Sequence, residues 1–257
     1  MALIEREAPA DGVTILRLNR REKHNALSLE FRRELAMHID NESDRSDVMA
    51  IIIAGNEQTF AAGADLGEII DLTPGHSRFD DLRVAWNSIA RCRKPIIAAV
   101  RGTALGGGFE LVLQCDLIIA GTKARFGLPE AKVGIVPGAG GMQRLSRLVG
   151  RHEAMLWLVT GQIMDASTAK ELGIVRELTP DDLVETRALD LAKMICALPP
   201  EVTDVIKRAL RLSENSHLDA AIQTERPWFE NLFGTEFQHK SMSAFLSRRS
   251  GQQKAAS

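Results

Sequence analysis

Short apolar runs rich in β-branched residues alternate with stretches of helical spacing, and this alternation is the feature that most constrains the fold. Each run has the length and composition of a β-strand. The runs cover residues 13–18, 48–54, 95–100 and 116–120. Helices that connect consecutive strands favour parallel pairing, because each crossover returns the chain to the same end of the sheet. The alternation continues to about residue 180 and predicts an α/β core with largely parallel strands.

A helix is predicted between the first two runs, over residues 28–44. Ser28 stands where an N-cap is expected, and Glu30 lies in the first turn. Apolar residues then follow at near-helical spacing: Leu29, Phe31, Leu35 and Ile39. This helix and its flanking runs form one strand, helix, strand unit.

The composition changes at Pro199 and Pro200. Proline disfavours helix in the residue before it, so this pair marks a boundary. Three segments beyond it have helical spacing and no strand run among them: residues 201–213, 217–233 and 235–249. We therefore predict an α/β core over residues 1–198 and a helical region over residues 199–257. The apolar faces of the helical region could fold back on the core or dock on another subunit.

Composition and charge exclude several classes of protein. The chain has 257 residues, 45% hydrophobic and 26% charged, which is typical of a globular protein and not of a disordered one. Its 32 Lys+Arg and 34 Asp+Glu leave a net charge of −2, so no global field attracts nucleic acid or an anionic membrane. The charged N-terminus lacks the apolar core of a signal peptide, and no apolar run approaches the ~18 residues of a membrane span. We expect a cytoplasmic protein, unless an organelle presequence was removed from it.

The three cysteines are widely spaced and form neither a CxxC pattern nor a Cys/His ligand pattern. They are Cys92, Cys115 and Cys196. Such a set indicates a reducing compartment and predicts no metal site.

Three glycine-rich loops follow strand runs, at residues 60–65, 102–110 and 136–141. Glycine lets a ligand approach the backbone, and free N–H groups at a helix start suit an anion or a developing oxyanion. Two nucleotide motifs do not fit. The second loop lacks the G-x-G-x-x-G spacing, and the third lacks the Lys and Ser/Thr of a P-loop. Each loop taken alone could still be only a turn.

Two acidic residues, Glu110 and Glu130, stand beside these loops in apolar surroundings, with no Lys or Arg in helical register. A carboxylate in such surroundings has a raised proton affinity, which suits an acid or a base. The alternative is a carboxylate that is only capped by backbone N–H groups or solvated. His24 and His152 lack triad partners and no G-x-S-x-G elbow occurs, so we expect no hydrolase triad.

Taken together, these segments resemble the enoyl-CoA hydratase/isomerase family, also called the crotonase family, over essentially the whole chain. Residues 18–27 are similar to its first CoA loop and residues 60–65 to its second. The resemblance implies an α/β spiral of ββα units with a C-terminal helical trimerisation region. It also implies a homo-oligomer, either a trimer or a dimer of trimers. The implied substrate is an acyl-CoA thioester, with coenzyme A as part of the substrate and no separate cofactor.

By position, the family's oxyanion hole falls on the backbone N–H groups of Ala62 and Gly107. Its two catalytic glutamates fall on Glu110 and Glu130, which stand 20 residues apart, the spacing of hydratases. Gly138 matches the position near the catalytic water. Two N–H donors would stabilise the enolate that forms as water adds to the conjugated double bond. Glu110 would mainly activate the water and Glu130 mainly protonate the α-carbon, although a shared role is open.

The resemblance also implies contacts with CoA or the acyl group. These fall on Lys23, His24, Ala26, Ala62, Gly63, Ala64, Asp65, Leu66, Gly107, Phe245 and Arg248. Phe245 and Arg248 belong to the closing helix, which approaches a neighbour's CoA in the family. The first loop departs from the pattern, with Arg21 where many relatives have proline and His24 where many have arginine.

The prediction for function is the reversible addition of water to a 2-enoyl-CoA, which gives a 3-hydroxyacyl-CoA in fatty-acid or related acyl-CoA degradation. Double-bond isomerisation is the first alternative, because it could use Glu130 alone. An RNA-binding relative is the second, and the net charge of −2 without interleaved aromatic and basic residues argues against it. A scaffold with a dead site is the third, and the presence of both acids argues against it.

Overall fold

The computed structural model describes residues 2–255, with side chains to residue 247. The chain divides into two compact units, Met1–Cys196 and Ala197–Ser257. The first unit holds two β-sheets and the helices that cover them, and the second is helical.

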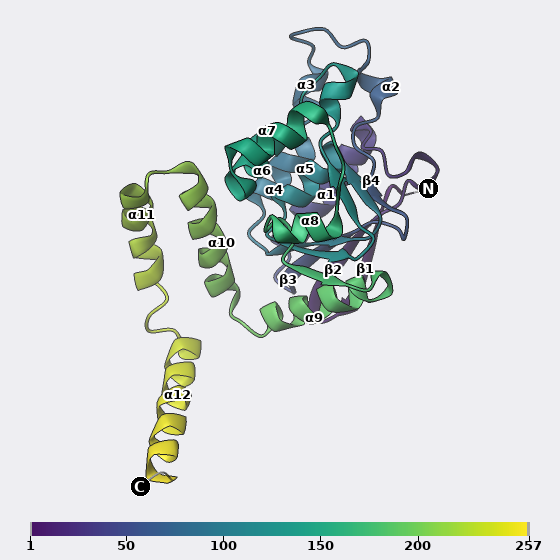
Figure 1. Ribbon diagram of the computed structural model, residues 1–257. Helices are drawn as coiled ribbons and strands as arrows, with labels where there is room; N and C mark the ends of the chain where they lie inside the picture. The colour runs from purple at the N-terminus through teal and green to yellow at the C-terminus, as the bar shows by residue number, and fades with distance from the viewer. Residues whose placement is uncertain (1, 256–257) are drawn as a thin grey trace. The chain divides into compact units, whose positions relative to one another are not determined.

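A six-stranded sheet forms the centre of the first unit, in the order β1-β2-β3-β5-β7-β10 (Figure 1). Its strands are β1 (Ile4–Ala10), β2 (Gly12–Leu18), β3 (Val48–Ala54), β5 (Ile96–Val100), β7 (Leu117–Gly121) and β10 (Glu177–Thr179). β1 pairs antiparallel with β2, and the other neighbours pair in parallel. The four predicted strand runs and their parallel pairing are therefore confirmed. The sequence did not reveal β1, in which Ile4 is the one buried residue.

Residues of the large sheet alternate between two apolar cores because successive strand side chains point to opposite faces. In β3, Ile51 and Ile53 lie in the first core, while Ile52 lies in the second. Helices α1 (Leu29–Asp44), α4 (Val84–Arg91) and α5 (Gly107–Gln114) pack in the first core. Helix α9 (Val184–Cys196) covers the other face with small residues, including Ala188 and Ala192.

Helix α1 begins as predicted, because the Ser28 hydroxyl accepts the N–H of Phe31 at 3.2 Å. This bond satisfies one of the free donors of the first turn. Helix α5 begins at Gly107, and so the second glycine loop itself forms the helix start.

A second, smaller sheet positions the loops that follow it. Its order is β4-β6-β8-β9, with β4 (Thr59–Ala61), β6 (Thr103–Leu105) and β8 (Arg125–Gly127) parallel, and β9 (Met164–Asp165) antiparallel. Three successive units each run through a strand of the large sheet, a strand of the small sheet and a helix. The predicted spiral of ββα units is therefore confirmed.

The remaining elements of the first unit are short. They are η1 (Arg21–Lys23), α2 (Leu66–Ile69), α3 (Arg78–Asp81), η2 (Glu130–Val133), α6 (Gly141–Val149), α7 (Arg151–Thr160), α8 (Ala166–Glu171) and η3 (Asp181–Leu183).

The second unit contains α10 (Pro200–Asn215), α11 (Leu218–Glu230) and α12 (Glu236–Ala255). Pro200 opens α10 at a position where its missing N–H costs no helical hydrogen bond. Within the unit, the Arg208 guanidinium lies 3.9 Å from the ring centre of Trp228, and the rings of Phe229 and Phe233 are 5.0 Å apart.

Candidate functional site

The small sheet brings the predicted site segments together. Its parallel strands β4, β6 and β8 end at Ala61, Leu105 and Gly127, and the carboxyl ends of parallel strands meet at one edge. Residues 62–65, 106–110 and 128–130 follow directly. Two predicted loops and both predicted acids therefore lie at the same edge of the small sheet.

Glycine is required where these loops pass close to one another. A Cβ on Gly108 would lie 2.3 Å from the Ala61 carbonyl oxygen, which no side chain could tolerate. Gly63 has φ +102°, and a Cβ there would lie 2.9 Å from the Leu105 carbonyl oxygen. Glycine at these two positions therefore lets the two loops contact each other through their backbones, and it also leaves room for a ligand.

The backbone N–H of Ala62 is already engaged, since it donates to the His24 carbonyl oxygen at 3.0 Å. This bond contradicts the prediction that Ala62 supplies a free oxyanion donor. The N–H groups of Ala64 and Gly107 donate to no acceptor among the described residues. The Ala64 nitrogen lies 3.7 Å from the place that a Cβ on Gly107 would occupy, so these two free groups are neighbours.

Glu110 lies in the first turn of α5 and is 4% exposed. Its Oε1 accepts two backbone N–H groups, from Ala139 at 2.8 Å and from Gly141 at 2.9 Å. A Cβ on Gly141 would lie 2.8 Å from the Glu110 Cγ, so only glycine fits at this point. These two hydrogen bonds fix the position of the Glu110 carboxylate against the third glycine loop.

Glu130 opens η2 and is partly buried. Burial raises the pKa of its carboxyl to about 7, and the negative charge of Glu110 contributes in the same direction. Its Oε2 is buried and has no hydrogen-bond donor among the described residues. Its Oε1 lies 2.9 Å from the place of a Cβ on Gly106, so the carboxyl rests against the second glycine loop.

The third loop contributes Ala139 and Gly141 as the donors that hold Glu110. Gly138 itself is exposed, and a Cβ there would meet nothing within 4 Å among the described atoms. Gly138 therefore borders open space and directly precedes Ala139, whose N–H binds the Glu110 carboxylate.

The first predicted CoA loop folds against the second through paired backbone and side-chain bonds. The Leu27 N–H donates to the Gly63 carbonyl at 2.8 Å, and the Arg20 guanidinium pairs with the Asp65 carboxylate at 2.8 Å. The buried Asn25 side chain donates to the Phe60 carbonyl at 3.0 Å and accepts the Arg20 N–H at 2.8 Å. Sequence reasoning missed Arg20 and Asn25 as residues that organise the site.

The other predicted contact residues differ in exposure. Lys23, His24 and Leu66 are exposed, whereas Ala26, Ala64 and Asp65 are partly buried. His24 has φ 50°, a left-handed conformation that ends η1. Phe245 lies in α12 and is exposed, while the side chain of Arg248 lies outside the described residues.

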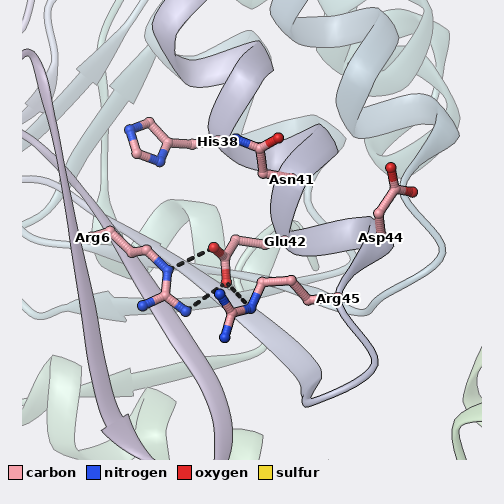
Figure 2. Close-up of a pocket in the computed structure, with 6 residues that line it drawn as sticks. All are labelled: Arg6, His38, Asn41, Glu42, Asp44 and Arg45. Atoms are coloured by element: carbon pink, nitrogen blue, oxygen red, sulfur yellow. Dashed lines mark hydrogen bonds and ion pairs between the residues drawn. The ribbon is translucent and has the colours of Figure 1, made fainter.

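The pocket in Figure 2 lies away from these loops and is lined by Arg6, His38, Asn41, Glu42, Asp44 and Arg45. Its central carboxylate, Glu42, accepts Arg6 Nε at 2.6 Å (Figure 2). Glu42 also accepts the Thr14 hydroxyl at 2.6 Å. Burial alone would raise the pKa of Glu42, but these hydrogen bonds outweigh it and lower the pKa. The charged groups of Arg6 and Arg45 both pair with Glu42 in this pocket.

The described residues contain no group of three or more His, Cys, Asp or Glu side chains placed to hold a metal ion. Among the helices of the described part, none combines the length and apolar character that crossing a membrane requires.

Relatives of the chain match it over nearly its whole length. A probable enoyl-CoA hydratase of Mycobacterium bovis is 39% identical over 250 residues, which cover 97% of this chain and 96% of the relative. The 2,3-dehydroadipyl-CoA hydratase of Escherichia coli is 39% identical over 237 residues, which cover 92% and 93%.

Solved structures show the same architecture. The enoyl-CoA hydratase of Bacillus anthracis superposes with a TM-score of 0.90 at 32% identity, and the match covers 96% of each chain. The predicted crotonase-like fold is therefore confirmed. The family model for enoyl-CoA hydratase/isomerase matches residues 9–255, and the chain belongs to this family.

Proposed function

We propose that the chain is an enoyl-CoA hydratase, which adds water reversibly to a 2-enoyl-CoA and gives a 3-hydroxyacyl-CoA. The observation that carries this proposal is the contrast between the two acids at one sheet edge. Glu110 accepts two N–H groups, whereas Glu130 has a pKa raised to about 7 by burial. A base and an acid around one water suffice for hydration.

The oxyanion hole of this proposal consists of the N–H groups of Gly107 and Ala64. Both are free among the described residues, whereas the Ala62 N–H is bonded to His24. A thioester oxygen held between them would gain hydrogen bonds as it takes up negative charge, which lowers the barrier to addition.

The chemical step then balances with these groups alone. The ionised Glu110 takes one proton from water, whose oxygen forms a bond to the β-carbon of the substrate. Electrons of the double bond move toward the thioester and form an enolate at the oxyanion hole. The protonated Glu130 then delivers its proton to the α-carbon, and the product carries one added water. Gly138, beside open space, leaves room for the reacting water.

The first two loops are the proposed CoA site. Lys23 and His24 are exposed on the first loop, where both can donate hydrogen bonds to CoA. Leu66 is an exposed apolar residue that follows the second loop. Ala26, Gly63 and Asp65 contribute mainly backbone and loop geometry, because the Asp65 carboxylate is paired with Arg20. Phe245 and Arg248 are proposed to approach the CoA of a neighbouring subunit.

A panel of CoA thioesters tests the reaction. We expect loss of the conjugated absorbance when the protein meets 2-enoyl-CoA esters, among them 2,3-dehydroadipyl-CoA, the ester named for the Escherichia coli relative. Gain of that absorbance from a 3-enoyl-CoA, with no hydration of any 2-enoyl-CoA, would favour isomerisation instead. A place in fatty-acid or related acyl-CoA degradation and a cytoplasmic location are part of the same proposal.

The helical region over residues 199–257 is proposed to hold subunits together as a trimer or a dimer of trimers. Its helices expose large apolar side chains, including Leu210, Leu218 and Phe229. Such side chains in number usually mark an interface. Truncation after residue 198 should therefore give monomers or aggregate in analytical ultracentrifugation. A fully active, compact monomer from this truncation would contradict the proposed role.

A further inference from the structure

Trp86 on α4 holds a buried hydrogen-bond donor that no described residue accepts. The residue is only 4% exposed, and its Nε1 has no hydrogen-bond partner in the described part of the chain. A buried indole N–H usually finds an acceptor, because leaving a buried donor unpaired costs free energy. The unpaired N–H therefore calls for an explanation, and a bound ligand can supply the acceptor.

The indole of Trp86 borders the corner where the proposed oxyanion donors lie. A Cβ on Gly107 would lie 3.8 Å from Cζ2 of the indole and 3.7 Å from the Ala64 nitrogen. Cζ2 and Nε1 are bonded to the same ring carbon, so the N–H lies beside the ring edge that meets this corner. An acyl group whose thioester oxygen is bound by the N–H groups of Gly107 and Ala64 would therefore begin close to the indole.

Arg32 on α1 places a buried positive charge over the same indole. It is 5% exposed, and its guanidinium carbon lies 4.8 Å from the centre of the Trp86 ring, a cation–π contact. Its Nε donates to the Leu27 carbonyl at 2.9 Å and its Nη1 to the Leu82 carbonyl at 2.7 Å. Its Nη2 donates to no acceptor of the described residues. The two carbonyls satisfy two of its donor groups but supply no negative charge.

The carboxylates of the described residues do not neutralise Arg32. None of them forms an ion pair with it. Glu68 accepts the Leu29 N–H at 2.7 Å, and Asp81 pairs with Arg33 at 2.8 Å. A buried charge without a counterion is costly. An anion from outside the chain would therefore be stabilised beside this guanidinium.

We propose that Arg32 and Trp86 bind a carboxylate at the far end of the substrate's acyl group. The proposal rests on the proposed hydratase function and narrows its substrates to 2-enoyl-CoA esters of dicarboxylic acids. A carboxylate supplies both the acceptor that the Trp86 N–H lacks and the negative charge that Arg32 lacks. A hydroxyl or keto oxygen on the acyl group would supply the acceptor only. Hydrogen bonds from a guanidinium to a carboxylate are also among the strongest that side chains form.

Two matched esters test the recognition of a carboxylate. The esters 2,3-dehydroadipyl-CoA and 2-hexenoyl-CoA have the same chain length and the same reacting double bond, but the first ends in a carboxylate and the second in a methyl group. The measurement is kcat/KM for both esters, because the ratio of the two values reports the chain end and cancels a general loss of activity. The wild type should favour the dehydroadipyl ester by roughly 10–100-fold, the usual contribution of a hydrogen bond to a charged group.

Two substitutions remove the proposed carboxylate ligands one at a time. Trp86→Phe keeps an aromatic ring and loses the N–H, whereas Arg32→Met keeps an unbranched side chain and loses the charge. Each should lower the ratio by about tenfold, mainly through a higher KM for the dehydroadipyl ester, while kcat/KM for 2-hexenoyl-CoA changes little. Arg32→Lys should retain most of the preference, because it retains the charge.

Trp157→Phe is the matched control for Trp86→Phe. Trp157 lies on α7, and its Nε1 is also buried without a hydrogen-bond partner among the described residues. The same chemical change at this position should leave the ratio of the two kcat/KM values as in the wild type. Circular dichroism and the melting temperature of each variant report its folding.

A wild type that hydrates 2-hexenoyl-CoA as well as the dehydroadipyl ester would overturn the proposal and leave the hydratase function standing. A preference that survives both Trp86→Phe and Arg32→Met, or that falls equally in Trp157→Phe, would also overturn it. If Arg32→Met does not fold, Trp86→Phe decides, and failure of both to fold would assign the two residues to the core and overturn the proposal. Hydration of no 2-enoyl-CoA at all would refute the proposed function, and this proposal with it.

Discussion

The two acids of the site occupy contrasting surroundings, although each follows a strand of the same small sheet. Glu110 lies inside α5, and its Oε1 accepts the N–H groups of Ala139 and Gly141. Glu130 opens η2, and its buried Oε2 has no donor among the described residues. One carboxylate is bound by two backbone donors of another loop, and the other is desolvated with its Oε2 unpaired.

This difference in surroundings shows how one type of side chain can supply both an acid and a base. Backbone N–H groups favour the charged form, whereas desolvation favours the neutral form. Burial accordingly raises the pKa of Glu130 to about 7. Surroundings that favour opposite protonation states are the usual mark of an acid and base pair. Here the glycine loop after η2 creates the difference, since it delivers its donors to one acid only.

The largest effect is expected from neutralising the acids themselves. Glu110→Gln and Glu130→Gln should each lower kcat by roughly 10²–10⁴-fold, the usual contribution of a positioned acid or base. The KM for the CoA ester should change little, because neither residue is proposed to bind CoA. Near-normal hydration by either variant would contradict the division into acid and base. Isomerase activity that survives only in Glu110→Gln would favour isomerisation by Glu130.

The next effect concerns the oxyanion donor one turn before Glu110. Gly107→Pro removes the N–H at the first position of α5, where proline is compatible with a helix. We expect kcat to fall by roughly 10²–10³-fold, the usual effect of losing one such donor. Gly107→Ala is the control, because it keeps the N–H and its Cβ would make only ordinary contacts, the nearest at 3.5 Å.

If Gly107→Pro has a melting temperature close to that of Gly107→Ala and hydrates the substrate at the same rate as Gly107→Ala, the N–H of Gly107 is not an oxyanion donor. Circular dichroism and steady-state kinetics on the two variants make this comparison. An equal decrease of kcat in both variants would show that the added bulk near Ala64, and not the missing hydrogen bond, lowers the rate.

Much of this arrangement is predictable from local sequence patterns. Apolar runs predict the strands of the large sheet, and Ser28 predicts the start of α1. Glycine loops beside Glu110 and Glu130 predict where the site lies, because small residues and isolated acids are local signals. The resemblance to the family supplied the ββα spiral, which the periodicity of the chain alone did not reach.

Other features depend on contacts between distant segments, and no local pattern reports them. Whether Ala62 or Ala64 has a free N–H is decided by the His24 carbonyl, which belongs to another loop. The donors that hold Glu110, Ala139 and Gly141, lie beyond β7, β8 and η2 along the chain. Arg32 in α1 is only 5% exposed and donates to the Leu27 and Leu82 carbonyls. From sequence alone, a charged residue on an amphipathic helix is expected to face solvent.

A moderate effect is expected where the glycine loop meets Glu110. Gly141→Ala would place a Cβ 2.8 Å from Glu110 Cγ and 3.0 Å from its Oε1, so the carboxylate must move. Because misplaced catalytic groups lose rate steeply, we expect kcat to fall by about 10–100-fold with the fold retained. Unchanged kcat, with circular dichroism like that of the wild type, would show that the position of Glu110 is not critical.

Glu130 should also be visible in the pH dependence of the wild type. It must be protonated to act as the acid, and its pKa is raised to about 7. The value of kcat/KM for hydration should therefore fall as pH rises above about 7. A rate that stays constant well above pH 8 would contradict the role of Glu130 as the acid.

The smallest effect is on stability and tests the desolvation of Glu130 without any substrate. The pKa of this carboxyl rises from 4.5 to about 7 in the folded protein. The folded state therefore binds more protons between these values, and the wild type loses stability as pH rises through this window. Glu130→Gln does not titrate, so its melting temperature relative to wild type should increase by about 2–4 °C between pH 5 and pH 8. Differential scanning calorimetry of both proteins at each pH measures this difference, and Glu177→Gln, at an exposed ion pair, is the control. If the difference between Glu130→Gln and wild type is the same at both pH values, Glu130 is solvated, and its contrast with Glu110 does not arise from burial.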